Sequence, residues 1–360
     1  MNTFLFCATD AGGAKNLVPL IKLTQWKGST YVVFSSETSQ RIFHDNNIPT
    51  QMANIKTVEQ AKIILRERNP SIVVCGTTSY EAIDRLLIAV AKQLGIKTMV
   101  VLDEWFNYRM RFEDQKGALV YLPDMICCQD DKARQEAIEE GIPAQHLVVT
   151  GSPYLTVLTN EAEKFYQQPP SLPTYIAPDD AFTLTFLSET HALDHGVDDR
   201  GGPLGDYLGY SELTVREDIF NIVNEIEGRI TVIEKLHPKD ERSFKPLNNN
   251  RIRWEVTRDA DLWPLLWHSD VVIGMRSMSL LEAAILGCRV VSYQPNLKID
   301  QLCTAVRLNL IECIKDKENL KAWIKQNLKE KKKDPLKEIR RFPFAKTETA
   351  EGIYQLAINS

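Results

Sequence analysis

The sequence predicts an α/β protein made of two doubly wound parallel sheets, Rossmann-like domains that face a cleft. Three observations carry this prediction. Short apolar segments rich in β-branched residues alternate with helical segments along the chain. The first apolar segment leads straight into a glycine turn and a helix, which is the opening unit of a doubly wound sheet. A proline-rich stretch, QQPPSLPTYIAP, divides the chain near its middle.

Length and composition fit two globular domains in a reducing compartment. The 360 residues are 44% hydrophobic and 25% charged, which supplies apolar material for two cores. A net charge of −5 argues against nucleic acid as a partner, because that binding needs clustered Lys and Arg. The seven cysteines form no C-x-x-C pair and several lie in apolar runs. No run is long enough to span a membrane, so we expect a cytoplasmic protein.

We expect six strands and five helices in the first half of the chain. Residues 3–8 form an apolar strand, the turn Asp10 to Lys15 contains two glycines, and a helix follows through Leu23. Alternation of this kind predicts a parallel sheet with right-handed crossovers. We expect an N-terminal domain over 1–166, with later strands at 31–35, 71–76, 97–102, 123–128 and 147–150, and helices at 38–44, 58–68, 80–94 and 132–140.

The second half repeats the architecture without repeating the sequence. A linker is expected over 167–180, a second Rossmann-like domain over 181–340, and over 341–360 a terminal helix that could pack back on the first domain. Ser152 and Pro153 have the residue types of a helix cap and first helical position. Strands are expected at 182–187, 230–234, 251–256, 270–274 and 289–293, and helices at 213–226, 261–268, 280–286, 300–308, 317–331 and 347–357.

The turn after the strand 270–274 is a candidate phosphate site. A helix that is apolar on most faces follows this turn and ends at Gly287, which we expect to be a left-handed cap. Free N–H groups at a strand-to-helix turn favour an anion. An alternative needs no ligand, because Ser279-Leu-Leu-Glu282 has the pattern of a capping box. Ser277 precedes that box and is freer for phosphate. The candidate ligands of this turn are Arg276, Ser277, Met278 and Ser279.

A histidine follows the strand 230–234 in the sequence Lys235-Leu-His237-Pro238. An imidazole at a strand end can contact a phosphate by a hydrogen bond and, when protonated, by charge. The alternative is a structural histidine before a bend that the proline forces.

An acid pair, Asp103-Glu104, follows the strand 97–102. A carboxylate there can act as a general base, because it can take the proton from a hydroxyl group that attacks as a nucleophile. The alternative is a strand-end acid pair in a loop salt bridge with Arg109 or Arg111. The polar residues that follow, Asn107, Tyr108 and Arg109, are candidate substrate contacts.

The chain resembles the GT-B glycosyltransferases. It shares with them two domains of similar length, these three clusters, and the lack of a G-x-G-x-x-G or P-loop motif. The resemblance is closest to bacterial sialyltransferases and other capsule or surface-polysaccharide transferases, and more distant to sugar-nucleotide 2-epimerases. It implies that His237 and the serine turn contact the donor's phosphate, that Glu282 binds the ribose, and that Asp103 or Glu104 is the general base. Trp105 stands where the sialyltransferase motif has glycine, which is a departure from the pattern.

Two further loops fit this resemblance. Gly12, Gly13 and Lys15 are similar to the first glycine loop of GT-B proteins, which often meets the acceptor, although glycines there also serve the turn alone. Ser188 and Glu189 occupy the matching loop of the second domain, which faces the donor phosphates in such enzymes.

Two other segments invite a functional interpretation. The histidines of HALDHGVDD are four apart, but the glycine-rich segment after them favours a loop over a metal site, and we expect no metal. The run Lys329–Lys333, with Arg340 and Arg341, is a solvated helix face or a peripheral contact with an anionic membrane.

The resemblance therefore implies a metal-independent and cofactor-independent glycosyltransferase of surface-polysaccharide biosynthesis. The donor would be a CMP-, UDP- or CDP-linked sugar and the acceptor a saccharide or a lipid-linked sugar, with inversion favoured over retention. Two alternatives stay open: a sugar-nucleotide 2-epimerase, and a non-catalytic protein that binds a nucleotide sugar.

Overall fold

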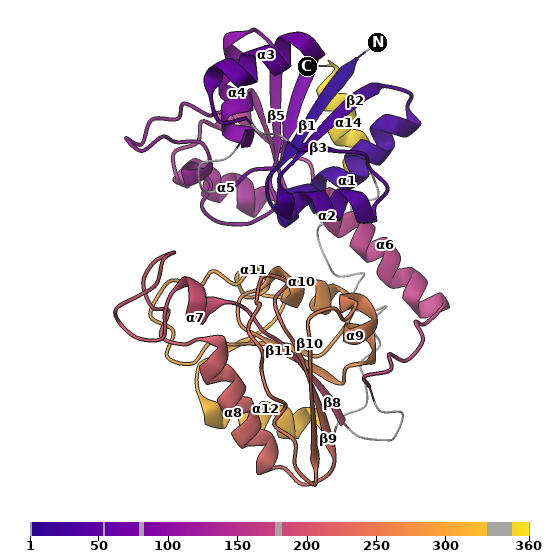
Figure 1. Cartoon of the computed structure of the whole chain (residues 1–360), viewed down its shortest axis with the longest axis vertical. Helices are drawn as coiled ribbons and strands as arrows, with labels where there is room; N and C mark the ends of the chain where they lie inside the picture. The colour runs from indigo at the N-terminus through magenta and orange to yellow at the C-terminus, as the bar shows by residue number, and fades with distance from the viewer. Residues whose placement is uncertain (1, 53–54, 79–82, 177–181, 330–347, 360) are drawn as a thin grey trace. The chain divides into compact units, whose positions relative to one another are not determined.

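The structure is a computed structural model that describes residues 2–52, 55–78, 83–176, 182–329 and 348–359. The chain forms two compact units, each with its own parallel sheet (Figure 1). Unit 1 comprises Met1–Asn160 and Pro343–Ser360, and unit 2 comprises Glu161–Phe342. The helix α6 (Pro153–Gln167) begins in unit 1 and ends in unit 2.

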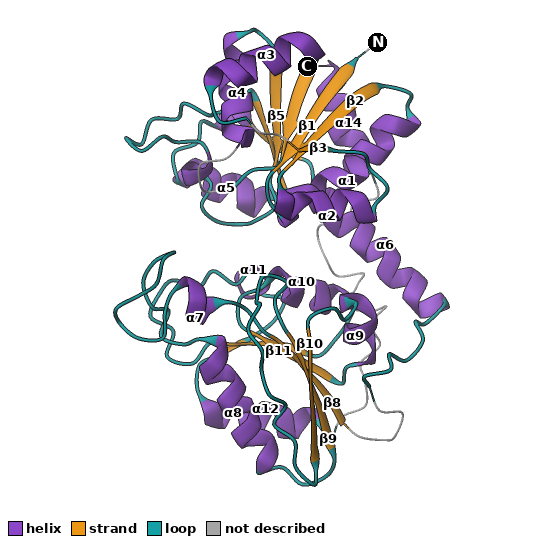
Figure 2. Ribbon diagram, viewed as in Figure 1, coloured by secondary structure: helices purple, strands orange, loops and turns teal. Residues whose placement is uncertain are grey.

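Unit 1 contains a seven-stranded parallel sheet in the order β3-β2-β1-β4-β5-β6-β7, with helices on its faces (Figure 2). The order reverses between β1 and β4, so their carboxyl ends mark the point where doubly wound sheets bind ligands. Its strands are β1 (Thr3–Ala8), β2 (Thr30–Ser35), β3 (Gln51–Met52), β4 (Ile72–Cys75), β5 (Lys97–Val101), β6 (Met125–Cys128) and β7 (Leu147–Val149). Its helices include α1 (Ala11–Trp26), α2 (Glu37–Asp45), α3 (Val58–Arg68), α4 (Ile83–Gln93) and α5 (Asp131–Glu139).

The C-terminal helix α14 (Thr349–Asn359) packs against α1 in the core of unit 1. Tyr354 stacks on Phe4 of the central strand with ring centroids 5.6 Å apart, and Ile353 is fully buried in the same cluster. The Tyr354 hydroxyl lies 2.8 Å from Ser29 Oγ. The last helix therefore completes a core that the first strand begins, because alternate residues of β1 point to this face.

Unit 2 contains a six-stranded parallel sheet in the order β10-β9-β8-β11-β12-β13. Its order reverses between β8 and β11, which places the loops after these two strands side by side. The strands are β8 (Phe182–Leu187), β9 (Ile230–Lys235), β10 (Ile252–Thr257), β11 (Val271–Gly274), β12 (Val290–Tyr293) and β13 (Cys313–Ile314). The helices are α7 (His191–Asp194), α8 (Glu212–Asn224), α9 (Leu262–His268), α10 (Met278–Ile285), α11 (Thr304–Arg307) and α12 (Lys317–Asn327) among the described residues.

The predicted fold class is confirmed, and the differences lie at sheet edges and helix ends. The two-residue edge strands β3 and β13 were not predicted, because so short a run has no detectable period. The helix expected over 300–308 is the single turn α11. Ser152 Oγ accepts the Leu155 N–H and Pro153 starts α6, as predicted. Gly287 has the predicted left-handed conformation, with φ of 72°. Most of the basic run after Lys329, with Arg340 and Arg341, lies outside the described residues.

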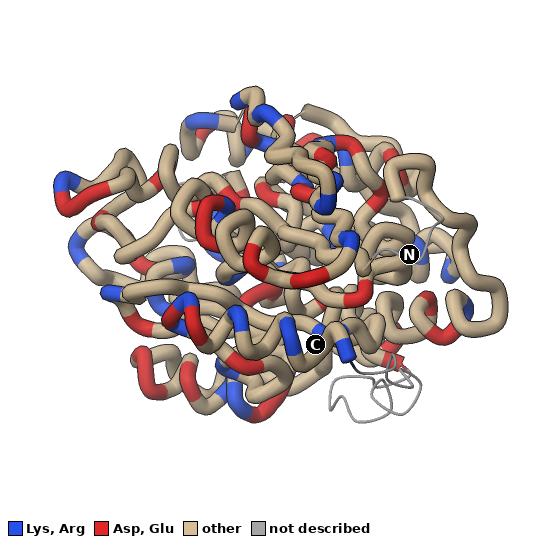
Figure 3. Tube along the Cα trace, turned by 90° about the horizontal axis from the view of Figure 1, so that it is seen from below, with Lys and Arg blue, Asp and Glu red and all other residues tan. Residues whose placement is uncertain are grey.

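Among the described residues, Lys and Arg are interspersed with Asp and Glu along the trace (Figure 3). The whole chain has a net charge of −5. Searching the helices of the described ranges finds none with the length and hydropathy that a bilayer crossing requires.

Candidate functional site

The carboxyl ends of β1, β4 and β5 bring a group of polar side chains together in unit 1. Asp10 follows β1, Thr77 follows β4 and Asp103 follows β5, and these strands are neighbours in the sheet. A fourth member, Asp84, lies in the first turn of α4 and is fully buried. Arg111 is the cation that contacts Asp103 and Thr77, and the charge of Arg85 acts on Asp84.

Asp103 is held by a buried ion pair. Arg111 Nη1 donates to Asp103 Oδ1 at 2.8 Å, and the two side chains are 5% and 8% exposed for Arg111 and Asp103 respectively. The same nitrogen lies 3.0 Å from both the carbonyl oxygen and the hydroxyl oxygen of Thr77. The loop salt bridge that the sequence left open is therefore present, and Arg111 is its partner.

Two glycines let the start of α1 approach these carboxylates. A Cβ on Gly12 would lie 2.2 Å from Asp103 Oδ2, closer than real Cβ atoms come to other atoms. A Cβ on Gly13 would lie 3.1 Å from the Gly76 Cα. The glycine loop is thus required by close packing at two points, beyond the needs of the turn.

Asp10 caps α1 and has an unusual protonation behaviour. Its Oδ1 accepts the Gly13 N–H at 2.7 Å, the contact of a helix N-cap. Burial and the neighbouring charge of Asp103 raise the pKa of Asp10 to about 7, against the opposing effects of that hydrogen bond and of Arg111. Burial likewise raises the pKa of Asp84 to about 6. Asp84 Oδ1 accepts from Thr9 Oγ1 at 3.3 Å, while its buried Oδ2 has no partner among the described residues.

The loop after Asp103 is mainly structural. Trp105 is fully buried and its Nε1 donates to Asp130 Oδ2 at 2.8 Å. A buried indole therefore stands where the sialyltransferase motif has glycine. Tyr108 is also fully buried and donates to Glu136 Oε2 at 3.1 Å. Arg109 binds Glu113 Oε2 and the Gly117 carbonyl oxygen, both at 2.8 Å. These contacts give Tyr108 and Arg109 structural partners, and their role in substrate binding stays a prediction.

The structure also describes three other predicted residues of unit 1. Asn107 has a left-handed backbone with φ of 56°, which reverses the loop. Glu104 is half-buried, and its carbonyl oxygen accepts from Gln129 Nε2 at 3.0 Å. Lys15 Nζ lies 3.2 Å from Tyr154 OH and 4.8 Å from the centroid of that ring.

In unit 2, Glu189 from the loop after β8 occupies the turn after β11. Its Oε1 accepts the backbone N–H groups of Arg276 at 2.8 Å and Ser277 at 3.1 Å. Its Oε2 lies 3.0 Å from His191 Nε2. Burial would raise the pKa of Glu189, but His191 and the Arg276 N–H lower it to about 2. A carboxylate of this chain thus takes two N–H groups that the sequence assigned to a phosphate, and that part of the prediction is corrected.

The Arg276 side chain lies between two histidines of the loop that follows β8. Its Nε is 3.1 Å from His191 Nε2, and its Nη2 is 3.0 Å from His195 Nε2. Burial and the Arg276 charge lower the pKa of His195, which keeps that imidazole neutral. Both Nδ1 atoms are buried and have no partner among the described residues, and the same holds for Ser188 Oγ beside Glu189. No group of three or more His, Cys, Asp or Glu suited to a metal is found in the described ranges.

The helix α10 begins differently from the predicted capping box. Ser277, not Ser279, is the N-cap, and its Oγ accepts the Ser279 N–H at 3.1 Å. The expectation that Ser277 is the freer serine is therefore wrong. Glu282 is 1% exposed, and its Oε2 accepts from Trp263 Nε1 at 2.9 Å. Met278 is the first residue of the helix and is half-buried.

His237 lies where β9 ends, at the same edge of the sheet as Glu189. Its Nδ1 accepts the Lys239 N–H at 3.1 Å, which leaves Nε2 as the protonated nitrogen of the neutral ring. Burial lowers the pKa of His237. Lys235 Nζ donates to the Arg258 carbonyl oxygen at 3.1 Å, whereas Pro238 is exposed.

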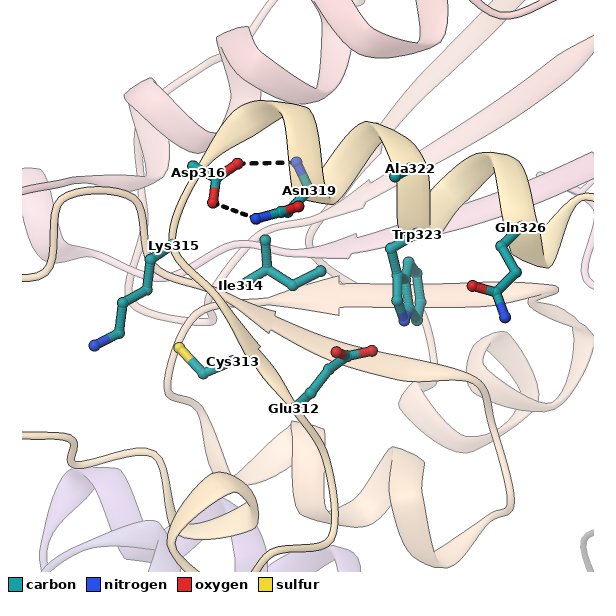
Figure 4. Close-up of a pocket in the computed structure, with 9 residues that line it drawn as sticks. All are labelled: Glu312, Cys313, Ile314, Lys315, Asp316, Asn319, Ala322, Trp323 and Gln326. Carbon is teal, nitrogen blue, oxygen red and sulfur yellow. Dashed lines mark hydrogen bonds between the residues drawn. The ribbon is translucent and has the colours of Figure 1, made fainter.

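A separate hollow of about 500 Å³ lies between the edge strand β13 and the helix α12. Cys313, Trp323 and Gln326 line it, and Asp316 bonds to Asn319 at its rim (Figure 4). None of the residues singled out from the sequence is among those that line it.

Two α/β units with parallel sheets match the GT-B fold, which has two Rossmann-like domains. The chain is similar to UDP-GlcNAc 2-epimerase of Methanocaldococcus jannaschii, solved with UDP-GlcNAc and UDP, at 16% identity with a TM-score of 0.66 over 99% of this chain and 100% of that one. It is similar to the Neisseria meningitidis UDP-GlcNAc 2-epimerase at 12% identity, with a TM-score of 0.67 over 99% of this chain and 100% of that one. It is similar to Acinetobacter baumannii MurG at 13% identity, with a TM-score of 0.60 over 100% of both chains. At these identities the similarity establishes the fold.

Sequence comparison adds no family. No protein-family model matches the chain, and no curated protein matches it. The resemblance to GT-B proteins is thus supported at the level of the fold, and the narrower resemblance to sialyltransferases is not.

Sequence reasoning missed the roles of Asp10, Asp84 and the two histidines beside Arg276. A signal existed for Asp10, since an acid between a buried strand and a pair of glycines is a helix cap at a ligand-binding edge. No local signal marks Asp84, because its burial depends on the packing of α4.

Proposed function

We propose that the protein is a glycosyltransferase that moves a sugar from a nucleotide-activated donor to a hydroxyl group of a saccharide or lipid-linked acceptor. Unit 2 would hold the phosphate of the donor and unit 1 would supply the base. The observation that carries the proposal is a contrast between the two strand-end groups. Carboxyl groups gather in unit 1, and one of them has a pKa of about 7. Arg276 and His237 lie at the corresponding edge of unit 2, together with the carboxylate of Glu189, which binds the Arg276 backbone.

This contrast matches the chemistry of glycosyl transfer. The donor leaves as a nucleotide whose phosphate carries the negative charge, and fixed cations and N–H groups stabilise that charge. We assign this role to Arg276, His237 and the start of α10. Glu189 keeps Arg276 and Ser277 in place, because it binds both backbone N–H groups. Glu282 is proposed as a residue that orients Trp263, since its carboxylate is buried against that indole.

A thermal-shift panel tests the donor site. CMP, CDP, UDP, GDP and their sugars are added to the full chain, and a ligand that binds only the folded state raises its melting temperature. We expect one nucleotide to raise the melting temperature. We expect Arg276→Met to need at least a tenfold higher concentration of that nucleotide for the same shift. Arg253→Met, in an exposed pair with Glu255, is the matched control. A panel without any shift would overturn the donor-site assignment.

A sugar-nucleotide 2-epimerase is the second candidate. Two observations favour it: similar structures of UDP-GlcNAc 2-epimerases match nearly the whole chain, and three carboxyl groups lie close together in unit 1. Proton removal at the sugar itself needs such acids. Incubation with a nucleotide sugar alone separates the candidates, because only an epimerase converts the donor without an acceptor.

A non-catalytic nucleotide-sugar-binding protein is the remaining alternative from the sequence. It predicts binding in the thermal-shift panel but no conversion of the donor with any acceptor.

The acceptor and its location are parts of the same proposal. A lipid-linked acceptor would bring the protein to the inner face of a membrane. Sedimentation with anionic vesicles tests this point, and binding that is lost at high salt is the expected result.

A further inference from the structure

The group of acids in unit 1 contains three carboxyl groups whose charges act on one another. Asp10 lies at the start of α1, Asp84 in α4 and Asp103 after β5, while Arg111 comes from the short helix η1 (Arg109–Arg111). Arg111 is already paired, because it binds Asp103 at 2.8 Å. Burial and the charge of Asp103 raise the pKa of Asp10, which favours a proton on that residue.

Asp103 is badly placed to take a proton from a substrate. Its Oδ1 belongs to the ion pair with Arg111, and its Oδ2 lies against the Gly12 backbone, where not even a methyl group fits. Proton uptake by Asp103 would also leave the buried Arg111 charge uncompensated.

Asp84 is excluded by its position, since its side chain is fully buried. Its contact with Thr9 Oγ1 ties it to the residue directly before Asp10. Asp84 therefore acts on Asp10 through its charge and through the position of Thr9.

Asp10, unlike Asp103 and Asp84, has a carboxylate oxygen that a ligand can reach. It is half-buried, and Oδ1 is fixed by the Gly13 N–H at 2.7 Å. Its Oδ2 accepts no hydrogen bond from the described residues and is not among their buried unpartnered atoms. One oxygen is thus anchored while the other is available to a ligand at the carboxyl end of the central strand.

We propose that Asp10, rather than Asp103 or Glu104, takes the proton from the acceptor hydroxyl, with Asp103 and Arg111 as positioning residues. This inference rests on the proposed transfer reaction. A pKa of about 7 suits the role, because a base works best when its pKa is near the working pH.

In the step, the acceptor O–H bond breaks and its proton passes to Asp10 Oδ2. The acceptor oxygen forms a bond to the anomeric carbon, and the bond from that carbon to the phosphate oxygen breaks. The electron pair leaves with the nucleotide, and Asp10 then releases its proton to water.

Three isosteric variants test the assignment: Asp10→Asn, Asp103→Asn and Glu104→Gln. Asparagine is as good a helix cap as aspartate, so the first variant keeps the start of α1. We expect Asp10→Asn to lower kcat/KM by about 10²–10⁴-fold while the donor-induced thermal shift persists. Glu104→Gln should lower kcat/KM by less than about tenfold, a change too small for loss of the base.

The pH profile provides a readout that a structural role would not move. For the wild type, kcat/KM should rise with pH, with its midpoint at a pH of about 7, where Asp10 loses its proton. Asp103→Asn removes the charge that raises this pKa, so its midpoint should move to lower pH. The wild-type profile carries the test by itself if Asp103→Asn does not fold.

The outcomes separate this inference from the proposed function. If a donor binds and the wild type transfers, near-wild-type transfer by Asp10→Asn overturns the role of Asp10 alone. The same holds if Asp103→Asn or Glu104→Gln abolishes transfer in a folded protein while Asp10→Asn does not. If no nucleotide sugar binds, the proposed function is overturned and this inference with it.

Discussion

Arg111 and Asp103 form a 2.8 Å ion pair in which each side chain is less than a tenth exposed. Arg111 comes from the short helix η1 in the loop after β5, and Asp103 follows the end of β5. The pair therefore fixes this loop to the sheet. Its carboxylate in turn lies against Gly12 of the helix α1. This one contact therefore holds three segments of unit 1 around the candidate site.

Loss of Arg111 should be costly for stability. We expect Arg111→Met to lower the free energy of unfolding by about 3–5 kcal/mol, because it leaves the Asp103 charge buried without its partner. Urea denaturation measures the change. The double variant Asp103→Leu/Arg111→Met should be less destabilised than Arg111→Met alone, and equal losses would contradict this account.

Gly12 should not tolerate a methyl group. Gly12→Ala would place a Cβ 2.2 Å from Asp103 Oδ2, and that carboxylate cannot move away without breaking its ion pair. We expect a loss of about 1–3 kcal/mol in the free energy of unfolding, together with reduced activity.

Gly352→Ala is the matched control for this substitution. Gly352 lies in the helix α14 with no atom within 4 Å of an added Cβ. This change should stabilise the protein by about 0.4–1 kcal/mol. Equal melting temperatures for the two alanine variants would contradict the proposed close packing at Gly12.

Glu189 should make stability depend on acid pH. Its pKa is lowered from 4.5 to about 2 in the folded protein, so the folded state favours the ionised form. The resulting stabilisation is present above pH 4.5 and is lost as pH falls towards about 2.

Glu189→Gln removes this pH dependence. The difference in unfolding free energy between the wild type and Glu189→Gln should shrink steadily over that acid range. A difference that stays constant with pH would show that the Glu189 carboxylate gains nothing from His191 and the Arg276 N–H.

The sequence predicted the fold because strand and helix patterns are local. Gly287, Ser152 and Pro153 have the predicted roles because each depends on the few residues around it. The start of α10 was predicted wrongly for a physical reason. Whether Ser277 or Ser279 caps the helix depends on Glu189, which arrives from a different strand and takes the N–H groups before the helix.

The same limit applies to the acids of unit 1. The strand-end position of Asp103 is visible in the sequence, whereas its pairing with Arg111 and its effect on Asp10 arise from the sheet order β1-β4-β5. Local patterns therefore locate the edge of the sheet that carries the candidate site, and tertiary contacts decide what each side chain can do there.

Product analysis of a nucleotide sugar, with and without an acceptor, tests the central claim most directly. The full chain is incubated with the nucleotide sugar that gives the largest thermal shift, alone and with a panel of saccharide acceptors, and the products are followed by NMR. The proposal predicts free nucleotide and a new glycoside in equal amounts, formed only when an acceptor is present. A 2-epimer of the donor formed without any acceptor would contradict it.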